Sequence, residues 1–183
     1  MASGPAKRSI DVHIFPEFRA VLRAPFARHA AQAALRTADP NGVRSVSVVV
    51  ADDAMLHDLN RRFRGFDEPT DVLSFGDESD ASLAPEGAGD VAFPDIPDEA
   101  TPLGEIVVSY PLAVKQAGEH NVSVDEEVSL LIVHGVLHLL GYDHAEASDE
   151  TAMKAAAARA LSDLSSPPRR TSTAKQFGAG GAG

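Results

Sequence analysis

Cysteine is absent from the 183 residues of this chain. Disulfide bonds, iron–sulfur clusters and a cysteine nucleophile are therefore excluded, which leaves His, Asp and Glu as the strong metal ligands. No stretch near the N-terminus resembles a signal peptide, since residues 1–8 are short and polar and residues 10–15 alternate between apolar and polar side chains. The longest apolar run, residues 128–140, contains two histidines, which argues against a membrane span. We therefore expect a cytoplasmic protein.

Basic residues are also missing from a long central part of the chain, residues 65–114. Twelve of the 27 acidic residues lie there, between Asp67 and Glu105, so the rest of the chain carries 15 acids and all 16 bases. The formal net charge of −11 therefore comes from residues 65–114, and the rest of the chain is nearly neutral. The net charge does not exclude a nucleic-acid partner. The arginines outside this region are compatible with a basic face that binds nucleic acid and equally with ordinary solvated helix faces.

The length fits one domain with additional segments. We expect a flexible lead-in over residues 1–8 and a single domain over residues 9–164. Within the domain, residues 76–102 are acidic and rich in proline, and we predict a loop insertion there. Residues 165–183 contain little that a core could bury and are predicted to form a disordered tail.

Hydrophobic periodicity predicts a mixture of strands and helices. The predicted strands span residues 9–15, 43–51, 72–75 and 103–109, and the predicted helices span residues 24–38, 53–63, 111–120, 124–140 and 150–164. This loose alternation favours an α+β fold, in which helices cover a small mixed β-sheet of about four strands. The helix over residues 124–140 is apolar on nearly all sides, so we expect it to be a central buried helix that carries the metal ligands described below.

Several helix ends can be placed from capping residues. Asp52 is a favourable N-cap for the helix that follows it, and Gly65 is expected to end that helix. Ser123 and Glu126 form the pattern of a capping box, in which each side chain accepts a hydrogen bond from the backbone N–H of the other residue. The buried helix should therefore begin directly after Ser123.

Three of the seven histidines lie within residues 134–144, which read HGVLHLLGYDH. His134 and His138 are four residues apart, so a helix places both imidazoles on one face. Gly141 then allows the helix to end, and His144 follows on the returning chain. Three nitrogen ligands with an open fourth side are typical of a catalytic zinc site, although nickel, cobalt or copper would also bind such a set.

The chemistry of this site depends on the residues beside the histidines. Asp143 could be a fourth ligand, a turn residue or an acceptor for the second N–H of a ligating histidine, and the last two roles are favoured. The histidine spacing is also that of metzincin proteases, which need a glutamate as general base directly after the first histidine. That position is Gly135 here, and glycine cannot transfer a proton. A metzincin-like metalloprotease is therefore the less favoured alternative.

Three further stretches accompany residues 134–144. They are residues 59–64 (LNRRFR), 69–75 (PTDVLSF) and 103–109 (LGEIVVS). In this order, the set resembles the YbeY endoribonuclease family, bacterial factors for ribosomal RNA maturation, over residues 9–164. The resemblance implies an α+β fold and a zinc-dependent endoribonuclease that cuts single-stranded RNA. It also implies a role in the maturation of small-subunit ribosomal RNA and in ribosome quality control.

The same resemblance implies site residues and partners. One Zn²⁺ ion would be held by His134, His138 and His144, and these histidines together with Arg64 would be the catalytic residues. Ribosomal RNA, the small ribosomal subunit and its assembly factors are the implied partners. Glu105 departs from the family, which usually has aspartate there, and the acidic loop is longer than the family's connection, so no role is carried over to either.

Arg64 suits the scissile phosphate because a guanidinium matches phosphate oxygens bidentately. Its alternative role is a plain charge at a helix C-terminus. Two nucleophiles are compatible with the site, namely a water activated by the metal and the RNA 2′-hydroxyl, with the metal stabilising charge. A non-catalytic function is a further alternative, in which a structural metal stabilises a ribosome-assembly factor that binds without cutting.

Overall fold

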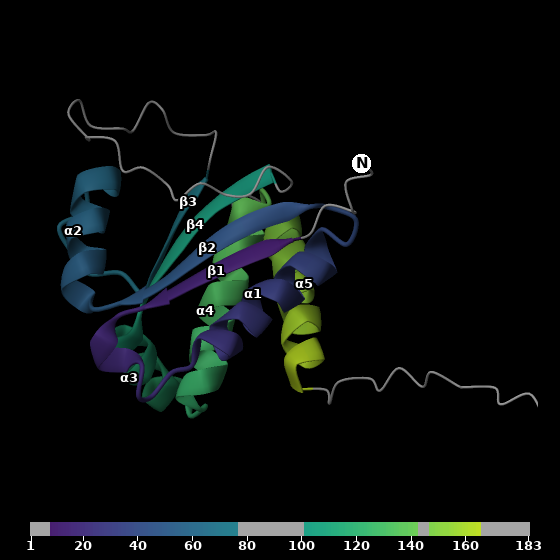
Figure 1. The fold of residues 1–183 in the computed structure, drawn as a ribbon. Helices are drawn as coiled ribbons and strands as arrows, with labels where there is room; N and C mark the ends of the chain where they lie inside the picture. The colour runs from purple at the N-terminus through teal and green to yellow at the C-terminus, as the bar shows by residue number, and fades with distance from the viewer. Residues whose placement is uncertain (1–7, 77–100, 143–146, 166–183) are drawn as a thin grey trace, which may run out of the picture.

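The computed structural model describes residues 8–76, 101–142 and 147–165 (Figure 1). In chain order the elements are β1 (Ser9–Ile14), a 3-10 turn η1 (Pro16–Phe18), α1 (Ala24–Ala38), β2 (Arg44–Ala51), α2 (Asp53–Arg64), β3 (Val72–Gly76), β4 (Thr101–Ser109), α3 (Tyr110–His120), α4 (Val124–Leu139) and α5 (Ala147–Ser165). Among the described residues, no helix combines the length and the apolar character that a bilayer span requires.

In the part of the chain that the structure describes, four strands form one sheet in the order β1-β2-β4-β3. β1, β2 and β4 are parallel, and β3 pairs antiparallel with β4 as the last of these four strands. The interior place of β2 agrees with its sequence, since Val46, Val48 and Val50 are all buried. The predicted α+β fold with a mixed four-stranded sheet is therefore confirmed.

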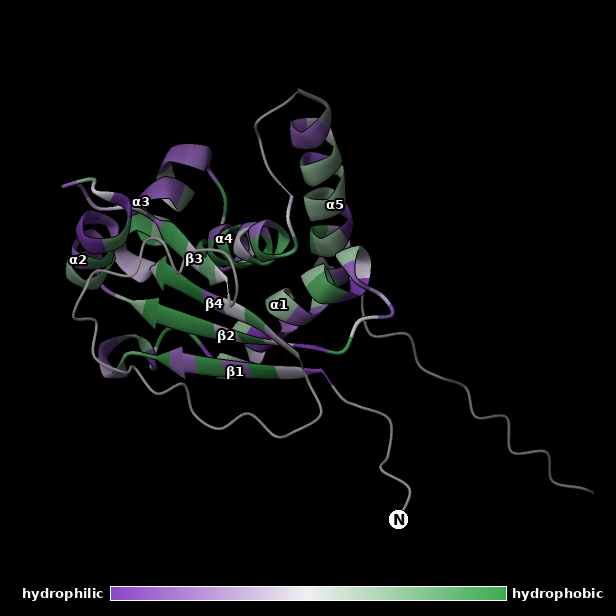
Figure 2. Ribbon diagram, turned by 90° about the horizontal axis from the view of Figure 1, so that it is seen from above, coloured by the Kyte–Doolittle hydropathy of each residue, from purple (hydrophilic) through white to green (hydrophobic). Residues whose placement is uncertain are grey.

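Helices cover both faces of this sheet (Figures 1 and 2). Because side chains alternate along a strand, neighbouring residues of β4 point to opposite faces. Ile106 and Val108 point into the main core, to which α1, α4 and α5 contribute. Val107 points the other way and packs with Leu56 of α2 and Leu73 of β3. α2 therefore lies on the opposite face of the sheet from α4.

α4 is the central helix of the larger layer, and it contacts α1, α3 and α5 as well as β3 and β4. It is largely apolar (Figure 2), and most residues between Glu127 and Leu137 are buried. Ser123 Oγ accepts a hydrogen bond from the Glu126 N–H at 3.2 Å, and Glu126 Oε2 accepts one from the Ser123 N–H at 2.9 Å. The predictions of a capping box and of a buried central helix are both confirmed.

Two element ends differ from the prediction. β4 begins at Thr101, so Thr101 and Pro102 belong to a strand and not to the predicted acidic loop. They extend the pairing of β4 with β2 back to Arg44. This pairing depends on a strand that is remote in the sequence, which local patterns do not register. α5 begins at Ala147 and not at Glu150.

The predicted lead-in, acidic loop and tail fall largely on residues 1–7, 77–100 and 166–183, outside the part of the chain that the structure describes. Asp143 and His144 also lie outside it. The division of the chain into a lead-in, one domain with a loop insertion and a tail therefore stays a prediction.

Close packing at two glycines joins α4 to the sheet. A Cβ atom at Gly135 would lie 2.7 Å from Ile106 Cγ2, so α4 approaches β4 more closely than a larger residue would allow. A Cβ atom at Gly104 of β4 would lie 2.1 Å from the Phe75 carbonyl oxygen and 2.9 Å from Leu139 Cδ2. The last turns of α4 can therefore pack against β3 and β4 only because both positions lack a side chain.

We predict that Gly135→Ala lowers the free energy of unfolding by about 1–3 kcal/mol, the usual range for overpacking a core. Gly118→Ala is the matched control, because Gly118 lies in helix α3 and an added Cβ there would meet nothing within 4 Å. The control change should be neutral or stabilise the fold by up to about 1 kcal/mol. Urea unfolding of both variants and the parent measures the difference, and equal stabilities of the two variants would contradict the packing argument.

Candidate metal centre

His134 and His138 lie on successive turns near the C-terminal end of α4. Their Nε2 atoms are 3.0 Å apart, and their ring centroids are 4.5 Å apart with 81° between the ring planes. Both residues are partly buried. The four-residue spacing thus brings the two imidazoles together on one side of the helix.

The two Nε2 atoms are spaced much as ligands of one metal ion would be. Zinc–nitrogen bonds of about 2.0–2.1 Å at a tetrahedral angle place two nitrogens about 3.3 Å apart. The 3.0 Å between the Nε2 atoms of His134 and His138 is a hydrogen-bond distance and is also close to that value. Imidazole nitrogens are also suitable donors for zinc. The pair therefore fits two positions of a zinc site.

The third predicted ligand, His144, lies outside the described residues, as does Asp143. Within residues 8–76, 101–142 and 147–165, no three His, Asp or Glu side chains gather in a way that could hold a metal ion. The three-histidine site therefore stays a prediction, and the structure contributes the geometry of two of its members.

The backbone turns directly after His138. Gly141 adopts a φ of 88°, in the left-handed region that favours glycine. The Gly141 N–H donates to the His138 carbonyl at 2.9 Å, and the Tyr142 N–H donates to the Leu137 carbonyl at 3.0 Å. These hydrogen bonds close the last turn of α4 and fix the backbone that carries His138. The helix thus ends at the place that Gly141 predicted.

Two of the other family-like stretches pack against the same turns of α4. Ser74 of β3 donates a hydrogen bond from its Oγ to the Gly135 carbonyl at 3.3 Å. Gly104 of β4 lies against Leu139, and this close approach is possible because glycine has no side chain. Each of these contacts is made next to a histidine position of α4. Stretches that are far apart in the sequence therefore converge beside the histidine pair.

Asp71 has a positioning role that its sequence position alone did not reveal. Its Oδ1 accepts a hydrogen bond from the Val72 N–H, and its Oδ2 accepts one from Gln116 Nε2, both at 2.8 Å. Its backbone carbonyl accepts one from the Ser109 N–H, also at 2.8 Å. Asp71 therefore ties the start of β3 to the end of β4 and to α3. The available signal was an aspartate directly before a strand, where its side chain can bond nearby backbone.

Arg64 is the last residue of α2 and is exposed. Arg61 and Arg62 near the same helix end form ion pairs with Asp58, at 3.0 and 3.2 Å. Arg64 forms no ion pair with any residue in the described part of the chain. Its guanidinium is therefore accessible to a phosphate from solvent.

Arg64 and the histidine pair belong to helices on opposite faces of the sheet, with β3 between them. Phe75 of β3 packs on Phe63 of α2, with ring centroids 5.3 Å apart, whereas Ser74 bonds to α4. The structure therefore brings His134 and His138 together but does not place Arg64 in contact with them.

Glu105 points to the sheet face opposite α4, the face to which Val107 also points. In register it lies between Ser47 of β2 and Phe75 of β3. Burial raises the pKa of Glu105, and a hydrogen bond with Ser47 opposes that shift in part. The sheet therefore separates this carboxyl group from the histidine pair.

Replacing Glu105 by glutamine should stabilise the fold at neutral pH. Because the folded-state pKa is raised, the parent protein loses stability as the pH rises from the unfolded-state pKa, near 4.5, through the folded-state pKa. Glutamine has no such loss, so the gain in unfolding free energy should appear at about pH 8 and vanish at about pH 4. Glu119→Gln, on an exposed position of α3, is the control. A gain of the same size at both pH values would refute this explanation.

The sequence matches the family model described as Endoribonuclease YbeY over residues 18–165. A relative of that name from Roseiflexus castenholzii is 41% identical over 147 residues, which cover 80% of this chain and 86% of the relative. Another from Dehalococcoides mccartyi is 43% identical over 150 residues, which cover 79% of this chain and 89% of the relative.

A protein of Thermotoga maritima with a known solution structure is also similar in fold. The two structures align with a TM-score of 0.52 over 91% of this chain and 99% of the other. Their sequence identity is 22%, so this similarity supports the fold alone.

Proposed function

The chain belongs to the YbeY endoribonuclease family, and from this membership we propose a zinc-dependent endoribonuclease that cuts single-stranded RNA. Its proposed role is the maturation of small-subunit ribosomal RNA and ribosome quality control, in the cytoplasm with the small subunit and its assembly factors. Family membership supports the nuclease activity. The chemistry rests on one observation, the approach of two imidazole nitrogens to 3.0 Å at the end of a buried helix.

In this proposal His134, His138 and His144 hold the ion. The donor set supports zinc, because it contains imidazole nitrogens and the chain has no thiolate to offer. A bound zinc ion would stabilise negative charge that develops on the phosphate. The capped and buried body of α4 supports a fixed ligand geometry, because its side chains are locked by packing.

Arg64 is proposed to bind the scissile phosphate of the RNA. The accessibility of its guanidinium supports this role, since Arg61 and Arg62 are engaged by Asp58. Arg64 and the histidine pair flank β3 from opposite faces, so an RNA strand that lies along the β3 edge could reach both. The alternative role, a charge at the C-terminus of α2, requires no such RNA path.

Single-residue variants test the site. His138→Ala should lose zinc, measured by metal analysis of the purified protein, and should reduce cleavage of single-stranded RNA by about 100-fold or more, since such an ion contributes several kcal/mol. Arg64→Ala should keep the zinc and lose roughly 100-fold in cleavage, because one donor to the developing charge is removed. Arg62→Ala is the matched control, an exposed arginine of the same helix that should cut RNA at nearly the parent rate.

The outcomes separate the candidate functions. A His138→Ala protein that lacks zinc but cuts RNA at the parent rate would refute the metal-dependent mechanism. A zinc-loaded parent protein that binds RNA with a steep salt dependence but does not cut it would favour the non-catalytic assembly factor. Equal losses for Arg64→Ala and Arg62→Ala would assign both arginines to general attraction of RNA.

Analysis of the product ends identifies the nucleophile. Attack by the 2′-hydroxyl leaves a 2′,3′-cyclic phosphate on one fragment and a 5′-hydroxyl on the other. Attack by water that displaces the 3′-oxygen leaves a 5′-phosphate and a 3′-hydroxyl. Both routes are compatible with the donor set and with the proposed role of Arg64.

A further inference from the structure

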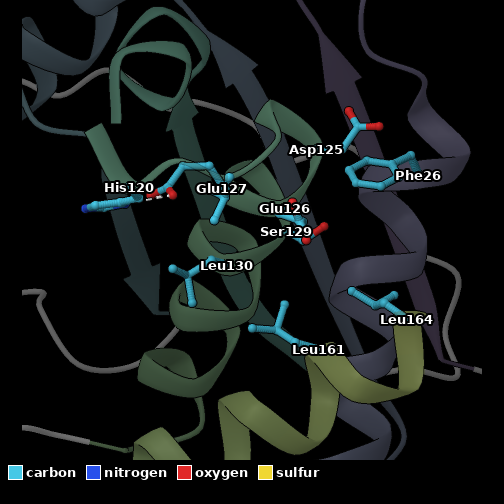
Figure 3. A pocket seen from close by; sticks show the side chains of 10 residues that line it. Phe26, His120, Asp125, Glu126, Glu127, Ser129, Leu130, Leu161 and Leu164 are labelled. Carbon is cyan, nitrogen blue, oxygen red and sulfur yellow. Dashed lines mark hydrogen bonds and ion pairs between the residues drawn. The ribbon is translucent and has the colours of Figure 1, made fainter. Parts of the chain in front are cut away.

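An apolar groove of about 510 Å³ lies beside the N-terminal half of α4 (Figure 3), whereas the histidine pair lies near the C-terminal end of that helix. Leu161 and Leu164 of α5 form one side, and Phe26 of α1 and Leu130 of α4 line it as well. Leu130 is 37% exposed and Val122, before α4, is 42% exposed. Leu130 and Val122 therefore present apolar surface in this groove that the described part of the chain does not cover.

The rim of this groove is acidic. Asp125 and Glu126, in the first turn of α4, are both exposed. Glu127 is only 3% exposed, and its Oε2 is bonded to His120 Nδ1 at 3.0 Å. This hydrogen bond raises the pKa of His120, so Glu127 has a partner that can neutralise it. The negative charge that remains for an incoming group is therefore that of Asp125 and Glu126.

The chain itself supplies a segment of complementary chemistry. α5 ends at Ser165, one residue after Leu164 in the groove wall. Residues 166–183 contain two adjacent arginines, one lysine and one phenylalanine, and no acidic residue. We propose that this C-terminal segment docks in the groove of its own chain, with Arg169 and Arg170 against the acidic rim and Phe177 on the apolar surface.

The connectivity makes this docking feasible. Arg169 follows Leu164 by five residues, so an extended chain reaches up to about 17 Å from the groove wall. A short tether also gives the segment an effective concentration on the order of millimolar. A segment with weak intrinsic affinity would therefore still occupy the groove for much of the time.

The docked segment is independent of the proposed RNA site. The residues that α4 contributes to the groove lie between Asp125 and Leu130, whereas His134 and His138 lie on its last turns. Removal of residues 166–183 should therefore leave zinc content and RNA cleavage unchanged. If the proposed nuclease function fails its tests, the docking proposal is unaffected. If the docking proposal fails, the proposed nuclease function is likewise unaffected.

A tryptophan reporter tests the proposal in the full-length protein. The chain has no tryptophan, so Phe177→Trp introduces a single tryptophan, whose emission is recorded under excitation that the two tyrosines do not absorb. Its emission should lie at shorter wavelength than that of a free peptide of residues 166–183 with the same substitution. Adding Arg169→Glu and Arg170→Glu should shift the emission to the value of the free peptide. Asp125→Arg in that background should restore part of the shift.

The apolar wall is tested in the same reporter protein. Leu130→Asp should abolish the shift, and Val21→Asp is the matched control, because Val21 is 59% exposed and lies outside the groove. Circular dichroism checks that each variant folds, and Val122→Asp replaces Leu130→Asp if that variant does not. The proposal would be overturned by parent-reporter emission equal to that of the free peptide. It would also be overturned by a folded wall variant, Leu130→Asp or its replacement Val122→Asp, whose emission equals that of the parent reporter. A shift that appears only as protein concentration rises would overturn it as well, since the segment would then occupy the groove of a second copy.

Discussion

The close approach of α4 to β4 is the contact on which the rest of the structure depends. It exists because Gly135 presents no side chain to Ile106 and Gly104 presents none to Phe75 and Leu139. Interiors are packed so densely that one extra methyl group at such a position must displace its neighbours. The same contact brings β3 and β4 against the turns that carry the histidine pair. The same contact between α4 and β4 therefore determines both the packing of the core and the placement of the candidate ligands.

Gly135 also shows how one residue can exclude a chemistry and permit a fold. The histidine spacing alone is shared with metalloproteases that need a glutamate at this position. A glutamate here would have to occupy the space of Ile106, in the interface between α4 and the sheet. Glycine at position 135 therefore has two consequences: it provides no general base, and it allows α4 to pack closely on Ile106 of β4. The missing general base and the packing at this position therefore both speak against a metzincin-like protease.

The sequence predicts best what short-range physics determines. The N-cap at Asp52, the capping box that begins at Ser123 and the helix stop at Gly141 are local hydrogen-bonding patterns, and each is found as predicted. The juxtaposition of the histidine pair follows from helical periodicity in the same way. The start of β4 at Thr101 and the separation of Arg64 from the histidines by β3 were not predictable, because both depend on which strands pair and on which face each helix packs.

The position of β3 gives the proposed substrate preference a physical basis. Side chains on opposite faces of a sheet are separated by the strands themselves, so one ligand can reach both only around an outer strand or past the strand ends. Phe63, next to Arg64, packs on Phe75 of β3 from one face, and Gly135, next to His134, accepts a hydrogen bond from Ser74 of β3 on the other. A single RNA strand has rotatable backbone bonds and unpaired bases, so it can bend around such an edge at low cost. A duplex holds its backbone in a fixed helical path, and its deformation costs free energy. The preference for single strands in the proposed function would then follow from the placement of two helices.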